Sequence, residues 1–129
     1  MKETVVVNDV GPRDGLQNQA KVLSPAERLR LVQALLDAGV SHIEVGSFVS
    51  PKAVPAMAGT GEIVAGLPPG KAVYSALVPN RRGYELARDA GTKVVELVVA
   101  TTDTMNLKNI NADTTTAMYN GFLETAILG

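Results

Sequence analysis

Short β-branched segments alternate with segments of helical periodicity along the 129 residues of the chain, and this alternation constrains the fold more than any other feature. The segments predicted to be strands are residues 4–7, 42–45, 72–78 and 94–99. The segments predicted to be helices are residues 25–38, 55–67, 81–90 and 113–128. A strand–helix order repeated four times favours a parallel sheet built from right-handed crossovers. We therefore predict an α/β fold with four parallel strands.

The first predicted helix has the clearest end signals. Ser24 can cap its amino terminus, with Pro25 at the first helical position and Glu27 placed to complete a capping box. Gly39 follows the helical pattern at the point where a residue in the left-handed conformation commonly ends a helix. By contrast, two internal glycines weaken the helix predicted over residues 55–67.

The composition is that of one soluble globular domain, predicted to span residues 1–129. Hydrophobic residues make up 46% of the chain and charged residues 19%, which excludes a disordered protein. Twelve basic and thirteen acidic residues give a net charge of -1, so we expect no nucleic-acid or membrane partner. The absence of cysteine excludes disulfides, thiolate metal sites and cysteine nucleophiles. We find neither a signal peptide nor a membrane span, and we expect a cytoplasmic location.

Polar residues collect in the segments that follow the predicted strands. These segments are residues 9–18, 46–52, 79–80 and 101–112. Sites in parallel sheets lie at the carboxyl ends of the strands, in the loops that lead into the helices. We therefore expect the functional site where these four loops meet.

Arg13 and Asp14 lie between two glycines in the first of these loops. A fixed cation beside a carboxylate ligand suits a reaction that builds negative charge next to a divalent metal ion. An ordinary turn with two solvated charges is the alternative. Glu44 lies within an apolar strand; if it is buried it needs a partner, and Arg13 is the candidate at the same sheet end. Alternatively, Glu44 lies at a strand edge and faces water.

The remaining polar candidates have simpler interpretations. His42 is the only histidine, and we expect it to be a hydrogen-bonded structural residue and not a ligand. Lys52 could lie near an anionic substrate, although a solvated lysine is the commoner outcome. Arg81 and Arg82 could contact phosphate, but adjacent arginines at the start of a helix are usually surface residues.

Two motifs follow the first two predicted strands. They read Val10-Gly-Pro-Arg-Asp-Gly-Leu-Gln-Asn18 and Ile43-Glu-Val-Gly-Ser-Phe-Val-Ser-Pro-Lys52. Together they resemble the motifs of hydroxymethylglutaryl-CoA (HMG-CoA) lyases, and the resemblance extends over nearly the whole chain to Asp113. It implies part of a (β/α)₈ (TIM) barrel, with about four βα units in a half-barrel. It also implies a lyase that uses Mg²⁺ or Mn²⁺ and cleaves 3-hydroxy-3-methylglutaryl-CoA to acetyl-CoA and acetoacetate, in leucine degradation and ketone-body metabolism.

The resemblance also implies roles for four residues. Asp14 would be a metal ligand, and Arg13 would stabilise the enolate that forms on the thioester side. Gln17 and Glu44 would be polar groups that position Arg13 and the substrate. The expected partner is therefore an acyl-CoA substrate.

The chain departs from this family in length and in its ligand set. A complete barrel has about 250 residues, and the family's metal-ligating histidines, its asparagine ligand and its catalytic cysteine lie in the later units. We therefore expect a truncated chain that is inactive alone and that pairs with another copy or with a complementary second half-barrel. Such a half-barrel would have open edges at its first and fourth strands and an exposed apolar inner face. The alternative is a non-catalytic half-barrel fragment that acts as an interaction module.

Overall fold

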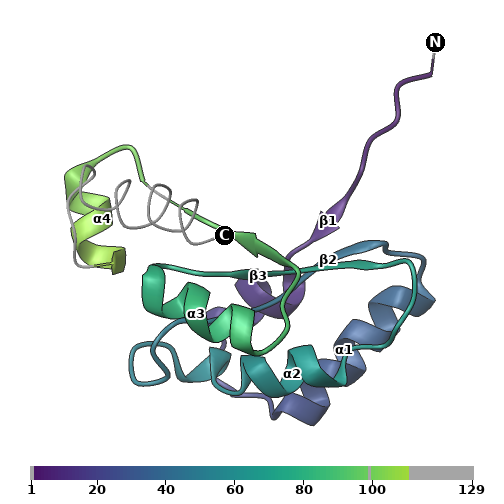
Figure 1. The fold of residues 1–129 in the computed structure, drawn as a ribbon, viewed down its shortest axis with the longest axis horizontal. Coiled ribbons are helices and arrows are strands. Elements are labelled where there is room, and N and C mark those ends of the chain that lie inside the picture. The colour runs from purple at the N-terminus through teal and green to yellow at the C-terminus, as the bar shows by residue number, and fades with distance from the viewer. Residues whose placement is uncertain (1, 99, 111–129) are drawn as a thin grey trace.

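Four parallel strands form one sheet in the computed structural model, which describes residues 2–98 and 100–110. The strands are β1 (Asn8–Asp9), β2 (His42–Ser47), β3 (Val73–Leu77) and β4 (Val94–Glu96). They lie in the order β1-β2-β3-β4, and each pairs in parallel with its neighbour (Figure 1). The prediction of an α/β fold with four parallel strands is confirmed.

Helices follow the strands, and three of them cover one face of the sheet. The helices are α1 (Pro25–Asp37), the short 3₁₀ turn η2 (Pro55–Met57), α2 (Thr60–Gly66), α3 (Arg81–Asp89) and α4 (Asp103–Ile110). Figure 1 shows α1, α2 and α3 in one layer against the same face of the sheet, and α4 apart from that layer. No helix in the described part of the chain is long and apolar enough to cross a membrane.

The core lies between this helical layer and the sheet. Val32 of α1, Ile63 of α2, and Ile43 and Val45 of β2 are buried together. Burying a side chain of this kind contributes about 1.5–3 kcal/mol relative to leaving it exposed. The core therefore holds β2, the strand that carries Glu44, firmly against α1 and α2.

The predicted ends of the first helix are confirmed. The Ser24 hydroxyl accepts a hydrogen bond from the Glu27 amide, and the Glu27 carboxylate accepts one from the Ser24 amide, which completes the capping box. Pro25 occupies the first helical position. Gly39 follows the helix with a φ of 92°, the left-handed conformation that its place in the sequence predicts.

The strand predicted over residues 4–7 is wrong, because β1 comprises only Asn8 and Asp9. Asn8 pairs with His42, the first residue of β2, so residues 4–7 extend beyond the beginning of the neighbouring strand. Their three valines are largely exposed, and Figure 1 shows this segment leading away from the sheet. A β-branched run becomes a strand only where a partner strand lies beside it. The fourth strand is likewise shorter than predicted and ends at Glu96.

Two helical predictions also need correction. The helix predicted over residues 55–67 is divided into η2 and α2, because Gly59 adopts a left-handed φ of 76° between them. Part of the polar loop predicted over residues 101–112 is the helix α4, and the Thr102 hydroxyl accepts a hydrogen bond from the Met105 amide at its beginning. A threonine at this position, which can cap a helix with its hydroxyl group, was the sequence signal for the beginning of α4. The helix predicted over residues 113–128 lies outside the described residues.

Candidate functional site

Arg13 lies in a tight turn of π-helical geometry, η1 (Gly11–Gly15), directly after β1. The Val10 carbonyl accepts hydrogen bonds from the amides of Arg13, Asp14 and Gly15, at 3.1, 2.7 and 3.3 Å. Pro12, near the beginning of the turn, is buried. The backbone of the turn is therefore fixed, and the Arg13 side chain leaves it toward the neighbouring strand.

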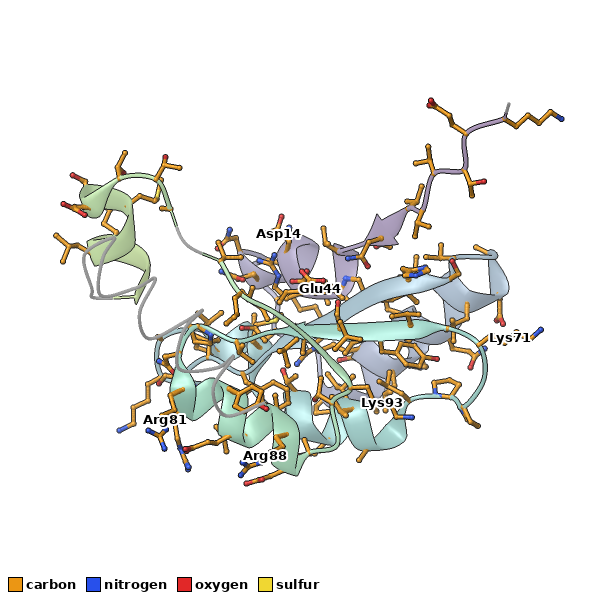
Figure 2. All side chains as sticks on the ribbon, turned by 45° about the horizontal axis from the view of Figure 1, so that its top comes forward. Asp14, Glu44, Lys71, Arg81, Arg88 and Lys93 are labelled. Atoms are coloured by element: carbon orange, nitrogen blue, oxygen red, sulfur yellow. The ribbon has the colours of Figure 1, made fainter. Side chains whose placement is uncertain are left out.

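The Arg13 guanidinium brings the four predicted site residues together. Its Nε donates to the Glu44 carboxylate, while Nη1 donates to Asp14 Oδ1 at 3.1 Å and to Gln17 Oε1 at 3.3 Å. Figure 2 shows the labelled Asp14 and Glu44 close together, on η1 and β2. The Arg13 side chain is only 17% exposed, so the alternative of a solvated arginine is wrong, whereas Asp14 is 62% exposed. The predicted pairing of Arg13 with Glu44 is confirmed.

Glu44 is a buried carboxyl group at the centre of this arrangement. Its side chain is 1% exposed, so the alternative of a carboxylate that faces water is wrong. Burial is the main cause that raises the pKa of Glu44 to about 7, followed by its hydrogen bond with Glu96; Arg13 acts in the opposite direction. Near neutral pH, Glu44 therefore carries a proton for a substantial fraction of the time.

Glu96 is a site residue that the sequence analysis missed. Its carboxylate is hydrogen-bonded to Glu44, and its Oε1 accepts hydrogen bonds from Ser75 Oγ at 2.6 Å and from Asn8 Nδ2 at 3.2 Å. The hydrogen bond with Glu44 is the main cause that lowers the pKa of Glu96, while burial opposes it. The available signal was that Glu96, like Glu44, is an acid inside an otherwise apolar strand.

These four polar residues share the face of the sheet that lies away from the helices. Asn8, Glu44, Ser75 and Glu96 come from β1, β2, β3 and β4 respectively. Side chains alternate between the two faces of a strand, and the residues on either side of Glu44 belong to the helix-covered core. The inner face of the half-barrel is therefore more polar than the apolar surface we expected. Val94, two residues before Glu96 on β4, adds a partly exposed apolar side chain to the same face.

An open cleft of about 330 Å³ lies at the carboxyl ends of the strands. Arg13, Asp14 and Gln17 form its polar wall, together with Ser47 at the end of β2. Its apolar wall consists of Val49, Leu77, Val78, Pro79, Val98 and Ala100. The segments that follow all four strands contribute, as the rule for parallel sheets predicts. Glu44 does not line the cleft, and it is joined to the cleft wall by its hydrogen bond with Arg13.

The described residues do not by themselves form a metal site. No group of three or more histidine, cysteine, aspartate or glutamate side chains that could hold a metal ion occurs among residues 2–98 and 100–110. Asp14 is exposed at the cleft and offers one carboxylate, but its Oδ1 already accepts a hydrogen bond from Arg13. One carboxylate falls short of the six oxygen ligands of an octahedral Mg²⁺ ion.

The other polar candidates lie elsewhere. His42 begins β2, at the end of the strand away from the cleft, and its Nδ1 lies 2.9 Å from the Ser41 hydroxyl, which confirms the prediction of a hydrogen-bonded residue. Lys52 is exposed and does not line the cleft. Arg81 forms an ion pair with Glu85 one helical turn away on α3, as expected of a surface arginine.

Four consecutive parallel βα units with a cleft at the carboxyl ends of their strands place the chain in the class of barrel-type α/β proteins. Within that class, the model of the HMGL-like family matches residues 4–121, and the chain belongs to this family.

Three relatives illustrate the similarity. The (R)-citramalyl-CoA lyase of Chloroflexus aurantiacus is 47% identical over 123 residues, which cover 87% of this chain and 39% of the relative. The HMG-CoA lyase of Pseudomonas mevalonii is 47% identical over 110 residues, which cover 84% of this chain and 36% of the relative. The solved structure of an HMG-CoA lyase from Acinetobacter baumannii, in complex with coenzyme A and 3-methylmalate, superposes with a TM-score of 0.90 at 34% identity. That superposition covers 95% of this chain and 40% of the solved chain.

The chain thus spans less than two fifths of the length of these two curated relatives. The four βα units correspond to part of the lyase barrel, in agreement with the predicted partial TIM barrel.

Proposed function

We propose that this chain supplies Arg13, Asp14, Gln17 and Glu44 to the site of an acyl-CoA carbon–carbon lyase. The proposed reaction is cleavage of 3-hydroxy-3-methylglutaryl-CoA to acetyl-CoA and acetoacetate. The observation that carries the proposal is the Arg13 guanidinium, which is held by a buried carboxyl group on one side and lines a cleft at the carboxyl ends of the strands on the other. In this proposal the reaction belongs to leucine degradation and ketone-body metabolism.

The proposed chemistry requires a fixed cation. The substrate's tertiary hydroxyl loses its proton, the carbon–carbon bond breaks, and its electron pair moves onto the thioester carbonyl oxygen of the departing fragment. That enolate oxygen carries negative charge until its carbon is protonated to give acetyl-CoA. A preorganised donor aimed at such an oxygen contributes about 2.7–4 kcal/mol at the transition state. Arg13 would meet the oxygen without reorganising, because Glu44 and Gln17 already hold its other N–H groups.

Gln17 has a positioning role in this proposal. Its Oε1 accepts a hydrogen bond from Arg13 Nη1, and the residue lines the cleft. It lies four residues after Arg13, so the turn η1 and the residues after it bring both side chains to one side. The Gln17 amide nitrogen is therefore available to a polar group of the substrate, while its carbonyl oxygen orients Arg13.

We further propose that Asp14 is one ligand of a divalent cation, Mg²⁺ or Mn²⁺, whose other ligands lie outside the described residues. The exposure of Asp14 at the cleft, next to Arg13, supports this proposal. The cation would act as a Lewis acid at the substrate oxygens. The described residues alone do not make its site.

A cation-binding measurement tests the role of Asp14. We expect the 129-residue chain alone to bind Mn²⁺ no more tightly than about 1 mM, as measured by electron paramagnetic resonance, because one carboxylate is a poor site. A chimera that replaces the matching segment of the P. mevalonii lyase with residues 2–110 of this chain should bind Mn²⁺ much more tightly. Asp14→Asn should weaken that binding at least about tenfold, whereas Asp37→Asn, on the exposed end of α1, should not. Equal binding by the chimera and its Asp14→Asn variant would remove Asp14 from the ligand set.

The same chimera tests the proposed reaction. We expect it to cleave 3-hydroxy-3-methylglutaryl-CoA, with acetoacetate and acetyl-CoA formed in equal amounts. Because one relative is an (R)-citramalyl-CoA lyase, citramalyl-CoA should be assayed in parallel, and a preference for it would change the proposed substrate but not the reaction class. A folded chimera that cleaves neither thioester would favour the alternative of a non-catalytic half-barrel.

A further inference from the structure

Glu44 and Glu96 approach each other across a strand that separates them. In the pairing of β2 with β3, Ser75 lies opposite Glu44. In the pairing of β3 with β4, Ser75 lies opposite Val94. Glu96 lies two residues after Val94, so it projects from the same face as Ser75 and Glu44. Because serine is small, the two longer carboxyl side chains can meet over it, and the Ser75 hydroxyl itself donates to Glu96.

The hydrogen-bond partners of the two acids differ. Glu96 accepts hydrogen bonds from the Ser75 hydroxyl and from the Asn8 amide, and both donors are uncharged. Glu44 accepts from Arg13, which is the only charged group besides the two acids among the described residues that contact the pair. Two carboxylates in contact at a buried position repel each other, so one of them retains its proton. The donors around Glu96 favour the charged form there, and this leaves the proton on Glu44.

We propose that Glu44 and Glu96 form a carboxyl–carboxylate pair that shares one proton next to Arg13, and that Glu96 is thereby a positioning residue for the guanidinium. The pair contains one proton and one negative charge and lies against the Arg13 guanidinium, which also donates to the Asp14 carboxylate. The Glu44 proton points to Glu96, so the remaining lone pairs of Glu44 accept from Arg13 Nε. Glu96 thus fixes the orientation of the carboxyl group that in turn fixes Arg13.

This arrangement has a consequence for the charge at the cleft. If Glu96 were neutral, Glu44 would lose the acceptor of its proton and would ionise at a lower pH. Arg13 would then be held by a full carboxylate, and its guanidinium would be less available to an oxyanion. The inference rests on the proposed function only for what Arg13 does to a substrate, because the shared proton itself is a property of this chain.

Carbon-13 NMR of glutamate side-chain carboxyl groups in the 129-residue chain tests the pair directly. We expect one carboxyl group to titrate with a midpoint of about 7 and a second, coupled one to titrate below the ordinary glutamate value. Glu96→Gln should lower the upper midpoint by at least about one pH unit. Glu62→Gln, at an exposed position in the first turn of α2, is the matched control and should leave both midpoints unchanged.

A second variant keeps the test decisive if Glu96→Gln does not fold. Ser75→Ala removes the closest donor to Glu96, so it should raise the lower midpoint by at least about half a pH unit. An upper midpoint that stays near 7 in Glu96→Gln would show that burial alone determines it, and would overturn the inference. A lower midpoint that is unchanged in Ser75→Ala would also overturn the inference. If both midpoints respond but the chimera cleaves no thioester, the proposed function fails while the proton-sharing pair stands.

Discussion

Arg13→Lys should lower kcat of the chimeric lyase by at least about 100-fold, the loss typical of removing one donor to an oxyanion. A lysine keeps the positive charge, but its ammonium group cannot donate simultaneously in the planar directions that Glu44, Asp14 and Gln17 occupy. The amine would remain with the buried Glu44 carboxyl group and withdraw from the cleft. The measurement is steady-state cleavage of 3-hydroxy-3-methylglutaryl-CoA at saturating substrate.

Arg88→Lys is the matched control for this prediction. Arg88 lies on the exposed side of α3, and its ion pair is with the adjacent Asp89, so this variant should retain full activity. Circular dichroism and thermal unfolding establish that both variants are folded. If Arg13→Lys retains kcat within about threefold of the parent, Arg13 has no place in the stabilisation of the enolate.

Gly46→Ala should destabilise the chain by at least about 2 kcal/mol, the largest stability effect that we predict from a single methyl group. A Cβ atom at Gly46 would lie 2.7 Å from Thr60 Oγ1 and 2.9 Å from Arg28 Nη2. Neither neighbour can easily move, because Thr60 Oγ1 is hydrogen-bonded to the carbonyls of Ser47 and Met57. Arg28 is fully buried and donates to the Ala58 carbonyl at 2.8 Å. Urea unfolding monitored by circular dichroism measures the effect.

Gly61→Ala is a control for which we expect a change in stability of the opposite sign. A Cβ atom there would make only an ordinary contact, 3.9 Å from the Ala90 Cβ. Alanine is a better helix former than glycine, so this variant should stabilise the chain by about 0.5 kcal/mol. A Gly46→Ala variant as stable as the parent would mean that β2 is not held against α2 through Thr60 and against α1 through Arg28.

The convergence of the site could be predicted from the sequence because parallel strands bring their carboxyl ends to one edge. Arg13 follows the first strand and Glu44 belongs to the second, so a parallel sheet in chain order places them side by side. The burial of Glu44 was left open by its apolar neighbours, which fit both a covered strand and a strand edge, and the structure shows that it is buried. The helix that precedes Glu44 was predictable for a local reason, since the capping box at Ser24 and the glycine at position 39 mark its ends.

The contact between Glu44 and Glu96 could not be predicted in the same way. It depends on the registers of two strand pairs and on a small serine between the acids, and neither register is encoded in one local pattern. The wrong prediction of the first strand has a similar origin. The valines of residues 4–7 have high β propensity, but β2 begins too late in the sheet to pair with them. At α4, one threonine hydroxyl at the beginning of the helix outweighed a polar composition that resembles a loop.

A double-mutant cycle between Arg13 and Glu44 tests most directly whether these two residues act as one unit at the cleft. It compares kcat/KM of the chimera with those of Arg13→Lys, Glu44→Gln and the double variant, at pH 8, above the pKa of Glu44 of about 7. We predict a coupling free energy of at least about 1 kcal/mol, because both substitutions alter the same contact between Arg13 and Glu44. Effects that add to within about 0.3 kcal/mol would show that the two residues act independently, and would contradict the coupling of Arg13 to Glu44 at the cleft.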